Sequence, residues 1–284
     1  MIIDSEIVDV LTINENETVE LANKDYYIYK SIMVEKGGKL IINNAKLYFD
    51  ICQIYCLGTI IANNSAFDKN DKVEYWNSII FSGNGINGSS FNNCTITNAR
   101  GVYNTESKVI KGALIADGSL NESLIIKNTK FILCGSTDTE NDLLGGAIYC
   151  DRINLEIENC EFICCSATYG GAIFSTKSKV KIINSKVEKC IAIKNGGAIT
   201  IIESPSLMIE NTNFSECHST DSGAIFTSDS ESILNKCIIS KCKCLRTASA
   251  IMAVNNSKLK INLLTINDCK SDGLSTIMIS SNSS

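Results

Sequence analysis

Residues 170–199 read GGAIFSTKSKVKIINSKVEKCIAIKNGGAI, and this stretch holds one complete copy of a repeat that runs through much of the chain. The opening motif, Gly-Gly-Ala-Ile, starts at Gly145, Gly170 and Gly196, with weaker copies at Ser222 and Ala248 and a trace in residues 273–277. Successive copies start 25, 26, 26, 26 and 25 residues apart. A fixed period of this length is typical of a solenoid, in which each repeat is one unit stacked on the next.

Two further motifs repeat in phase with the first. One reads apolar-x-Asn-(Cys/Ser/Thr)-x-apolar and is clear in residues 126–131, 157–162, 182–187 and 209–214. The other reads apolar-x-x-Cys. It places six of the 14 cysteines at one repeat position: Cys134, Cys165, Cys190, Cys217, Cys242 and Cys269. Three motifs that keep one phase are strong evidence for a genuine repeat.

The composition of the repeat selects the fold class. The Leu-x-x-Leu-x-Leu frame of leucine-rich repeats is absent, and helical repeats need 33 residues or more. Segments such as residues 155–158 and 180–183 are short, alternating and β-branched, as strands are. Three strands of about five residues with their corners fill one turn of a β-helix. We therefore predict an all-β fold, a right-handed parallel β-helix solenoid of the pectate-lyase-like kind with about ten coils. It forms a single domain over residues 1–284, with residues 1–30 as a possible N-terminal cap and residues 31–284 as coils.

Stacking also predicts what equivalent residues do. A column of asparagines should form a ladder at one corner, with amides bonded along the stack; its members are Asn64, Asn93, Asn128, Asn159, Asn184 and Asn211. The glycine pair should supply a corner with positive φ. The single proline, Pro205, fits a fold in which nearly every strand donates hydrogen bonds on both sides.

Charge and hydropathy exclude several classes of function. The formal net charge of −5 makes nucleic acid an unlikely partner. No apolar run approaches the 18 residues of a transmembrane segment. Residues 1–21 contain five acidic residues and no apolar core, unlike a secretory signal. We expect no cofactor and no metal.

The 14 cysteines allow three interpretations. The one that we favour is a ladder of free, buried thiols acting as small apolar residues. Disulfides between stacked cysteines are the second, although parallel Cβ atoms about 4.8 Å apart exceed the usual range for a bridge. Zinc is the third, but Cys242-x-Cys244 and Cys164-Cys165 lack the spacing of structural zinc sites.

The strand after the glycine pair carries a candidate binding face. If the isoleucines of this motif point into the core, the residues that follow them point outward, because strand side chains alternate. The outward residues would be Tyr149, Phe174, Thr200, Phe226 and Met252. In the opposite orientation the isoleucines form the outer column, so either arrangement gives an apolar stripe several coils long. A stripe of this kind often marks an interaction surface, and aromatic rings also suit stacking on sugars. We expect Tyr149, Phe174, Phe226 and Met252 to bind a ligand.

An enzyme is the main alternative. The one compact acidic cluster, Asp138, Glu140 and Asp142, is a possible calcium loop of a polysaccharide lyase or glycoside hydrolase. The chain has no adjacent Asp-Asp pair, only three arginines (Arg100, Arg152 and Arg246), and one histidine, His218, without an evident acid partner. Catalysis is therefore the less favoured hypothesis, since a fold alone does not imply a function.

The alternation of Gly-Gly-Ala-Ile with Phe-x-x-Asn-like motifs resembles the repeat of the polymorphic outer-membrane proteins. The likeness is clearest over residues 112–279, and here cysteine replaces the asparagine of Phe-x-x-Asn in six coils. The resemblance implies an adhesin-like β-helix at the cell surface or outside the cell.

We thus predict a non-catalytic, adhesin-like or surface-structural protein that binds a protein or carbohydrate partner on a coil face. Unpaired strand edges at the ends allow end-to-end self-association, and the stripe allows face-to-face association. The absence of a signal peptide leaves an intracellular structural solenoid as a further alternative.

Overall fold

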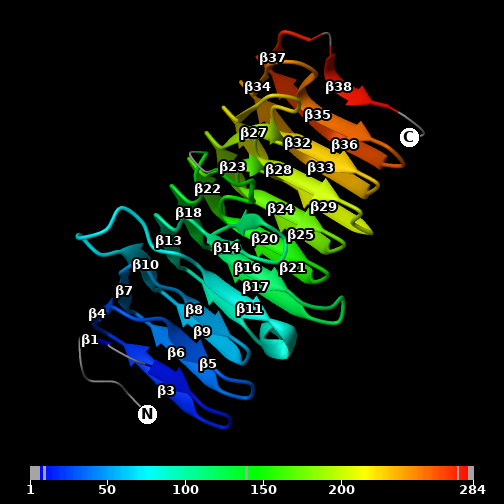
Figure 1. The fold of residues 1–284 in the computed structure, drawn as a ribbon. Helices are drawn as coiled ribbons and strands as arrows, with labels where there is room; N and C mark the ends of the chain where they lie inside the picture. The colour runs from blue at the N-terminus through cyan, green and yellow to red at the C-terminus, as the bar shows by residue number, and fades with distance from the viewer. Residues whose placement is uncertain (1–6, 9–10, 138–139, 274, 281–284) are drawn as a thin grey trace.

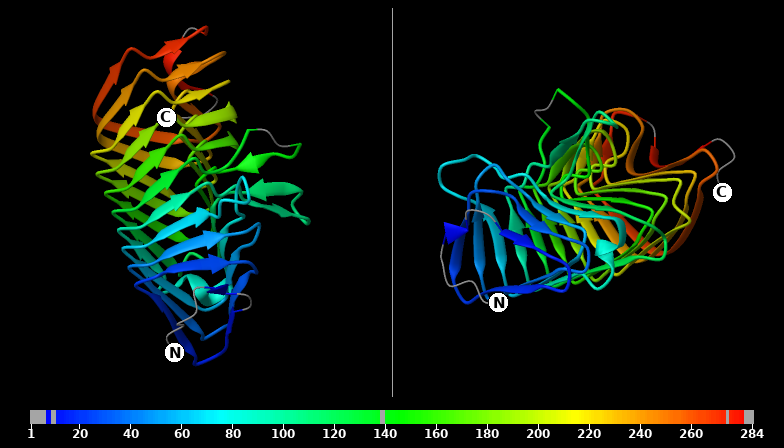
Figure 2. Two further views of the ribbon diagram at one scale, coloured as in Figure 1. Left: turned by 90° about the vertical axis from the view of Figure 1, so that its left-hand side faces the viewer. Right: turned by 60° about the horizontal axis from the view of Figure 1, so that its bottom comes forward.

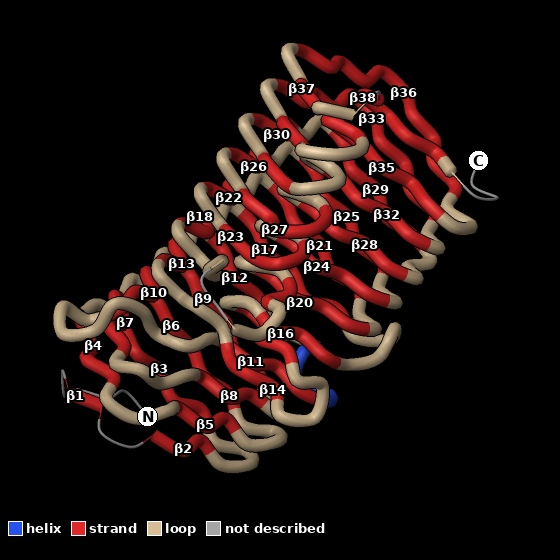
Figure 3. The backbone as a smooth tube through the Cα atoms, turned by 45° about the horizontal axis from the view of Figure 1, so that its top comes forward, coloured by secondary structure: helices blue, strands red, loops and turns tan. Residues whose placement is uncertain are grey.

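The computed structural model describes residues 7–8, 11–137, 140–273 and 275–280. The chain winds into an elongated parallel β-helix, with its N-terminal and C-terminal segments at opposite ends of the stack (Figure 1). Within the described residues, strands and their corners make up nearly all of it, with one short 3-10 helix, η1 (Gly83–Ile86) (Figure 3). The predicted β-helix solenoid is confirmed.

One wall of the helix is an 11-stranded sheet whose strands pair in parallel and in sequence order. It contains β2 (Leu11–Ile13), β5 (Ile32–Val34), β8 (Ile54–Cys56), β11 (Ile79–Ser82), β16 (Leu114–Asp117), β20 (Ile148–Asp151), β24 (Ile173–Thr176), β28 (Ile199–Ile202), β32 (Ile225–Ser228), β35 (Ala248–Val254) and β38 (Ser275–Ile279). Because each strand comes from a successive coil, equivalent repeat positions form straight columns along this wall.

The other two walls are joined in a 19-stranded sheet, because β33 (Glu231–Ser240) and β36 (Lys258–Asn267) run through the corner between them. One row contains β3 (Thr18–Ala22), β6 (Lys39–Asn43), β9 (Thr59–Asn63), β12 (Ser90–Asn92), β17 (Ser123–Lys127), β21 (Asn154–Glu158), β25 (Lys179–Ile183) and β29 (Ser206–Glu210). The second row contains β1 (Ile7–Val8), β4 (Asp25–Ile28), β7 (Lys46–Phe49), β10 (Ala66–Lys69), β13 (Thr95–Thr97), β18 (Lys130–Ile132), β22 (Glu161–Ile163), β26 (Lys186–Glu188) and β30 (Asn213–Ser215).

A smaller 8-stranded sheet covers the connection back to the first wall. It contains β14 (Val102–Asn104), β15 (Val109–Lys111), β19 (Leu143–Leu144), β23 (Ser166–Tyr169), β27 (Ile191–Asn195), β31 (His218–Ser219), β34 (Lys243–Cys244) and β37 (Lys270–Ser271). Strands β14 and β15 form an antiparallel hairpin, unlike the parallel pairs around them. This hairpin and the loop before β19 project from one side of the stack (Figure 2).

The interior of the tube is filled by the alternating apolar residues of every strand. Phe131 and Phe162 stack with parallel rings 5.1 Å apart and are fully buried. Near the N-terminal end, the buried Trp76 stacks on Phe49 at 4.5 Å and donates Nε1–H to the carbonyl of Thr97 at 2.7 Å. The single tryptophan of the sequence therefore lies in the core.

The predicted asparagine ladder is present in part at one corner, where side-chain bonds join its members in pairs and Asn128 donates to Asn92 at 2.8 Å. The amide of Asn93 donates to Asn64 at 2.8 Å, and that of Asn211 donates to Asn184 at 2.7 Å. The sequence analysis missed a second role of these residues. All six have φ between 47° and 54°, a left-handed conformation that asparagine tolerates better than most residues.

The residue after each of these asparagines explains the (Cys/Ser/Thr) position of the motif. The hydroxyl of Ser185 donates to the carbonyl of Ile183 at 2.8 Å and accepts the backbone N–H of Cys160 at 3.1 Å. The thiol of Cys160 lies 3.3 Å from the carbonyl of Glu158 and 3.5 Å from that of Ile126. A small side chain with an S–H or O–H thus satisfies backbone groups that the corner leaves unpaired.

All 14 cysteines are free, and most are buried. Burial raises the pKa of Cys94 and of Cys160 to about 11, so these thiols stay protonated at neutral pH. Among the described residues, no group of three potential ligand side chains could hold a metal ion. The structure therefore agrees with thiols that serve packing and corner hydrogen bonds.

Exchange of Cys160 for serine tests this corner role. We expect Cys160→Ser to change the free energy of unfolding by less than about 1 kcal/mol, because serine occupies the same position in the next coil. Cys160→Ala removes the donor and should cost about 1 kcal/mol. Urea denaturation of the two variants measures the difference. A larger loss for serine than for alanine would show that the thiol acts only as an apolar residue.

The two ends of the stack differ. Within residues 1–30, the predicted cap, strands β2, β3 and β4 pair with β5, β6 and β7 in the same pattern as later coils. At the other end, Ile261 and Ile279 are 37% and 46% exposed, although they occupy positions that are interior in earlier coils. Self-association through this end remains a prediction.

Candidate functional site

The outward face of the 11-stranded sheet carries the predicted stripe. Tyr149 pairs in register with Ile115 on one side and with Phe174 on the other. The neighbouring column, which includes Ile148 and Ile173, is fully buried in the core. The isoleucines therefore point into the tube, and the aromatic residues point away from it.

The stripe is nevertheless not an open surface. Tyr149 and Phe174 are each 7% exposed and Phe226 is 8% exposed, while Met252 is half-buried. Tyr149 and Phe174 stack with parallel rings 5.9 Å apart. Residues of the projecting hairpin, of strands β19 and β23, and of the 11-stranded sheet pack around them: Ile80, Val102, Leu144, Tyr169 and Ile202. A ligand role for these four residues remains a prediction, and in this structure the protein itself covers three of them.

The predicted acidic loop is only partly described. Asp138 lies outside the described residues, and Glu140 is exposed. Both carboxylate oxygens of Asp142 accept hydrogen bonds from Lys194 Nζ, at 3.1 and 3.2 Å. Asp142 is thus already neutralised by a lysine, and calcium binding by this loop remains a prediction.

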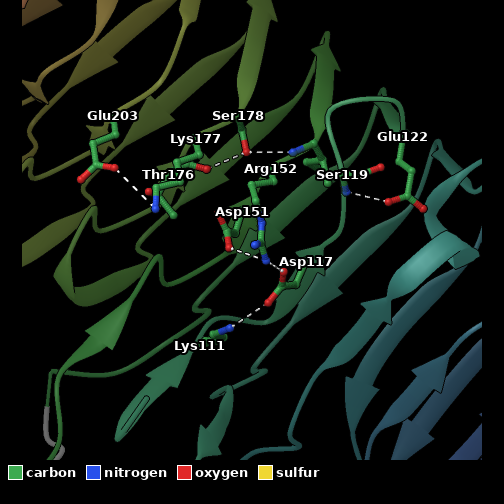
Figure 4. A network of polar contacts seen from close by, with 11 residues as sticks. Lys111, Asp117, Ser119, Glu122, Asp151, Arg152, Thr176, Lys177, Ser178 and Glu203 are labelled. Carbon is green, nitrogen blue, oxygen red and sulfur yellow. Dashed lines mark hydrogen bonds and ion pairs between the residues drawn. The ribbon is translucent and has the colours of Figure 1, made fainter. Parts of the chain in front are cut away.

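A polar cluster that the sequence analysis missed lies beside the stripe (Figure 4). Asp117 and Asp151 end strands β16 and β20, are partners in register, and point outward. Arg152 Nη2 donates a hydrogen bond to Asp117 Oδ1 at 3.0 Å and forms an ion pair with Asp151 Oδ2 at 3.1 Å. Lys111 Nζ contacts Asp117 Oδ2 at 3.4 Å and lies 4.3 Å from the centre of the Tyr149 ring. Two acids and two bases therefore meet on one small area of the sheet.

The two carboxylates have different surroundings. The side chain of Asp117 is 36% exposed, whereas that of Asp151 is 16% exposed. Oδ1 of Asp151 is buried without a hydrogen-bond partner. Burial is the main cause that raises the pKa of Asp151, and the charge of Asp117 adds to it, while Arg152, Lys111 and Lys177 act in the opposite direction. Burial also raises the pKa of the Tyr149 phenol.

A cavity of about 200 Å³ adjoins the cluster. Its floor is the outward face of β8, β11 and β16, and its wall is the hairpin β14–β15. Tyr55, Tyr103 and Asn104 line it together with Lys111 and Asp117. Tyr103 is 45% exposed, so its ring is available to a ligand. Aromatic surface and a few converging polar groups are the usual composition of a binding site.

Local sequence explains how the hairpin places these groups. The side-chain oxygen of Asn104 accepts hydrogen bonds from the backbone N–H groups of Glu106 and Ser107, which closes the turn. Strand β15 then ends at Lys111, directly before the coil that carries Asp117. The insertion thus brings Lys111 beside a carboxylate only six residues further along the chain.

The acid pair had a signal in the sequence. Residues 112–117 read GALIAD and residues 146–151 read GAIYCD, two copies of the same motif that both end in aspartate. The two aspartates are 34 residues apart, which is longer than the 25–26-residue period because the loop before β19 lies between them. These two aspartates are not next to one another in the sequence; the stacking of coils makes them neighbours in space.

Comparison with known proteins supports the fold. A family model described as the right-handed β-helix region matches residues 170–284. The chain is accordingly a right-handed parallel β-helix. A solved structure titled "Crystal structure of Agl-KA catalytic domain" aligns with a TM-score of 0.26 and 11% identity. That alignment covers 95% of this chain and 62% of that chain. No curated protein matches the sequence. Among the described residues, no helix is long and apolar enough to cross a membrane.

Proposed function

We propose that this protein binds a carbohydrate chain in the groove between the hairpin β14–β15 and the 11-stranded sheet. The observation that carries the proposal is the convergence of Tyr55 and Tyr103 with Lys111 and Asp117 on one cavity. Aromatic rings stack on the apolar faces of pyranose rings, and carboxylates and amides accept or donate hydrogen bonds to sugar hydroxyls. The groove offers both kinds of contact.

The charge of the cluster favours a neutral sugar. Lys111 and Arg152 each contact a carboxylate, so the two acids and the two bases compensate one another. A polyanionic glycan would be repelled by Asp117, and the two cations beside it, Lys111 and Arg152, already pair with carboxylates. We therefore expect neutral polysaccharides to bind better than polygalacturonate.

The resemblance to polymorphic outer-membrane-protein repeats supports an adhesin-like role at a cell surface for such binding. In this proposal the β-helix acts as a rigid rod that presents the groove. Rigid elements hold binding residues more accurately than loops do. Of the four predicted stripe residues, Tyr149 supports the groove from one side, since its ring contacts Lys111.

Binding to a panel of soluble glycans tests this function. The panel contains β-1,3-glucan, β-1,4-glucan, α-1,4-glucan, galactomannan, chitin oligosaccharides and polygalacturonate, each measured by affinity electrophoresis and calorimetry. We expect Tyr103→Ala to weaken binding of the retained neutral glycan about tenfold, because loss of one stacked anchor costs more than about 1 kcal/mol.

Tyr27→Ala provides the matched control. Tyr27 is 38% exposed and lies on β4 of the 19-stranded sheet, stacked on Tyr48 and away from the groove. Its replacement should leave binding unchanged. Retention of no glycan in the panel, or equal effects of the two tyrosine substitutions, would refute the proposed groove.

A further inference from the structure

The geometry of the acid pair allows more than binding. Asp117 Oδ1 and Asp151 Oδ2 both contact the same nitrogen, Arg152 Nη2, at 3.0 and 3.1 Å. These two oxygen atoms therefore lie no more than about 6 Å apart. The carboxyl groups of retaining glycosidases are about 5–5.5 Å apart, whereas those of inverting enzymes are about 6.5–9.5 Å apart. The upper bound for these two oxygens lies below the separation in inverting enzymes and is compatible with that in retaining ones.

We propose that Asp117 and Asp151 hydrolyse a glycosidic bond of the sugar held in the groove, with retention of configuration. Asp117 is the nucleophile, and Asp151 is the general acid and then the general base. This inference rests on the proposed function, because the sugar must first bind beside Asp117.

The surroundings of the two acids match these roles. Asp117 lines the cavity, and Lys111 and Arg152 stabilise its negative charge. Asp151 lies deeper and has a buried, unpartnered oxygen, an environment that favours the protonated acid. Surroundings that favour the ionised form of one carboxyl group and the protonated form of the other are typical of acid–nucleophile pairs.

The reaction balances with water as the second substrate. Asp117 attacks the anomeric carbon while the bond to the leaving oxygen breaks and Asp151 gives that oxygen its proton. Asp151, now a carboxylate, takes a proton from water, and the remaining hydroxyl adds to the anomeric carbon as the bond to Asp117 breaks. Both carboxyl groups return to their starting states, and no oxidant or metal takes part in these steps.

Arg152 is the positioning residue of this scheme. Its side chain is 54% exposed and bridges the two acids from the solvent side. Asp151 must release Arg152 before it can protonate a leaving group, and the exposed guanidinium is able to move. We expect Arg152→Gln to shift the basic limb of the pH–rate profile upward, because Asp151 then loses its nearest cation, while Asp117, Lys111 and Lys177 remain around it.

The experiment measures cleavage and binding in parallel. The glycan panel is incubated with the full chain, new reducing ends are quantified, and products are identified by mass spectrometry. Asp117→Asn and Asp151→Asn should each reduce cleavage at least about 100-fold. Binding of the glycan should persist in Asp151→Asn, whereas Asp117→Asn removes a carboxylate that lines the cavity and is therefore assessed by cleavage and by its melting curve. Glu203→Gln is the matched control, because Glu203 pairs with Lys177 at an exposed corner two coils further along.

Two readouts separate the roles. Proton NMR of the first product formed should show retained anomeric configuration. A 2-deoxy-2-fluoro glycoside of the cleaved sugar should label the peptide that contains Asp117, and melting curves should show both Asn variants folded. Inversion, labelling elsewhere, or cleavage that persists in both variants would overturn the assignment. Binding without cleavage by the wild-type chain would overturn hydrolysis and leave the proposed function intact, whereas absence of binding would remove both.

Discussion

Phe162→Ala is expected to lower the free energy of unfolding by about 3–5 kcal/mol, the range for removal of a buried aromatic side chain. Phe162 is fully buried and stacks on Phe131 in the middle of the tube. Its backbone is held by strands on both sides, β18 and β26. Because these neighbours cannot move inward without breaking ladder hydrogen bonds, the cavity stays largely open. Chemical denaturation with guanidinium measures the loss.

Ile163→Ala on the same strand is the control for this substitution. Ile163 points outward and is partly exposed, so its truncation should cost less than about 1 kcal/mol. Equal losses for the two variants would contradict the assignment of inward and outward faces on β22 (Glu161–Ile163).

Gly171→Ala is expected to cost about 3 kcal/mol, the upper range for overpacking of a tight site. A Cβ atom at this position would lie 2.2 Å from the carbonyl oxygen of Gly197 and 2.7 Å from that of Ile191. Both are backbone atoms of the next coil, so neither can rotate away. The coils must separate locally, which weakens the ladder on either side of the corner.

Gly83→Ala separates this clash from backbone strain. Gly83 has a φ of +60°, but a Cβ atom there meets nothing within 4 Å. Its replacement by alanine should lower the free energy of unfolding only by the cost of a left-handed backbone conformation, about 1–2 kcal/mol. In thermal unfolding, the melting temperature of Gly83→Ala should therefore be clearly higher than that of Gly171→Ala. The reverse order would show that the second glycine of the motif is needed for conformation and not for close approach.

The two glycines of the repeat illustrate how far the sequence analysis reached. It predicts a positive φ for the pair, and Gly170 has a φ of +63°. Gly171 is not left-handed; it is required because the next coil approaches its backbone. A repeat shows that a position favours glycine, but the choice between the two physical reasons depends on how adjacent coils meet.

The candidate site was less accessible to sequence reasoning. Strand alternation predicts that Tyr149 and Phe174 lie on the face opposite the isoleucines, and the structure decides that this face is the outer one. The cover over them comes from residues outside the repeat, among them Val102 and Leu144. Insertions have no period, so their path over the coils cannot be obtained from the repeat.

The sequence by itself determined the β-helix, the column of equivalent isoleucines and the column of corner asparagines, while the structure decided that the isoleucines point inward. The helix and the two columns depend only on a period that returns equivalent residues to one place, and parallel strands impose that period on every coil. The tertiary structure alone decided that Asp117 and Asp151 share Arg152 and that Lys111 joins them. Those contacts join coils of unequal length and a hairpin that folds back onto the sheet. The number of residues between two side chains therefore does not predict how far apart they lie in space.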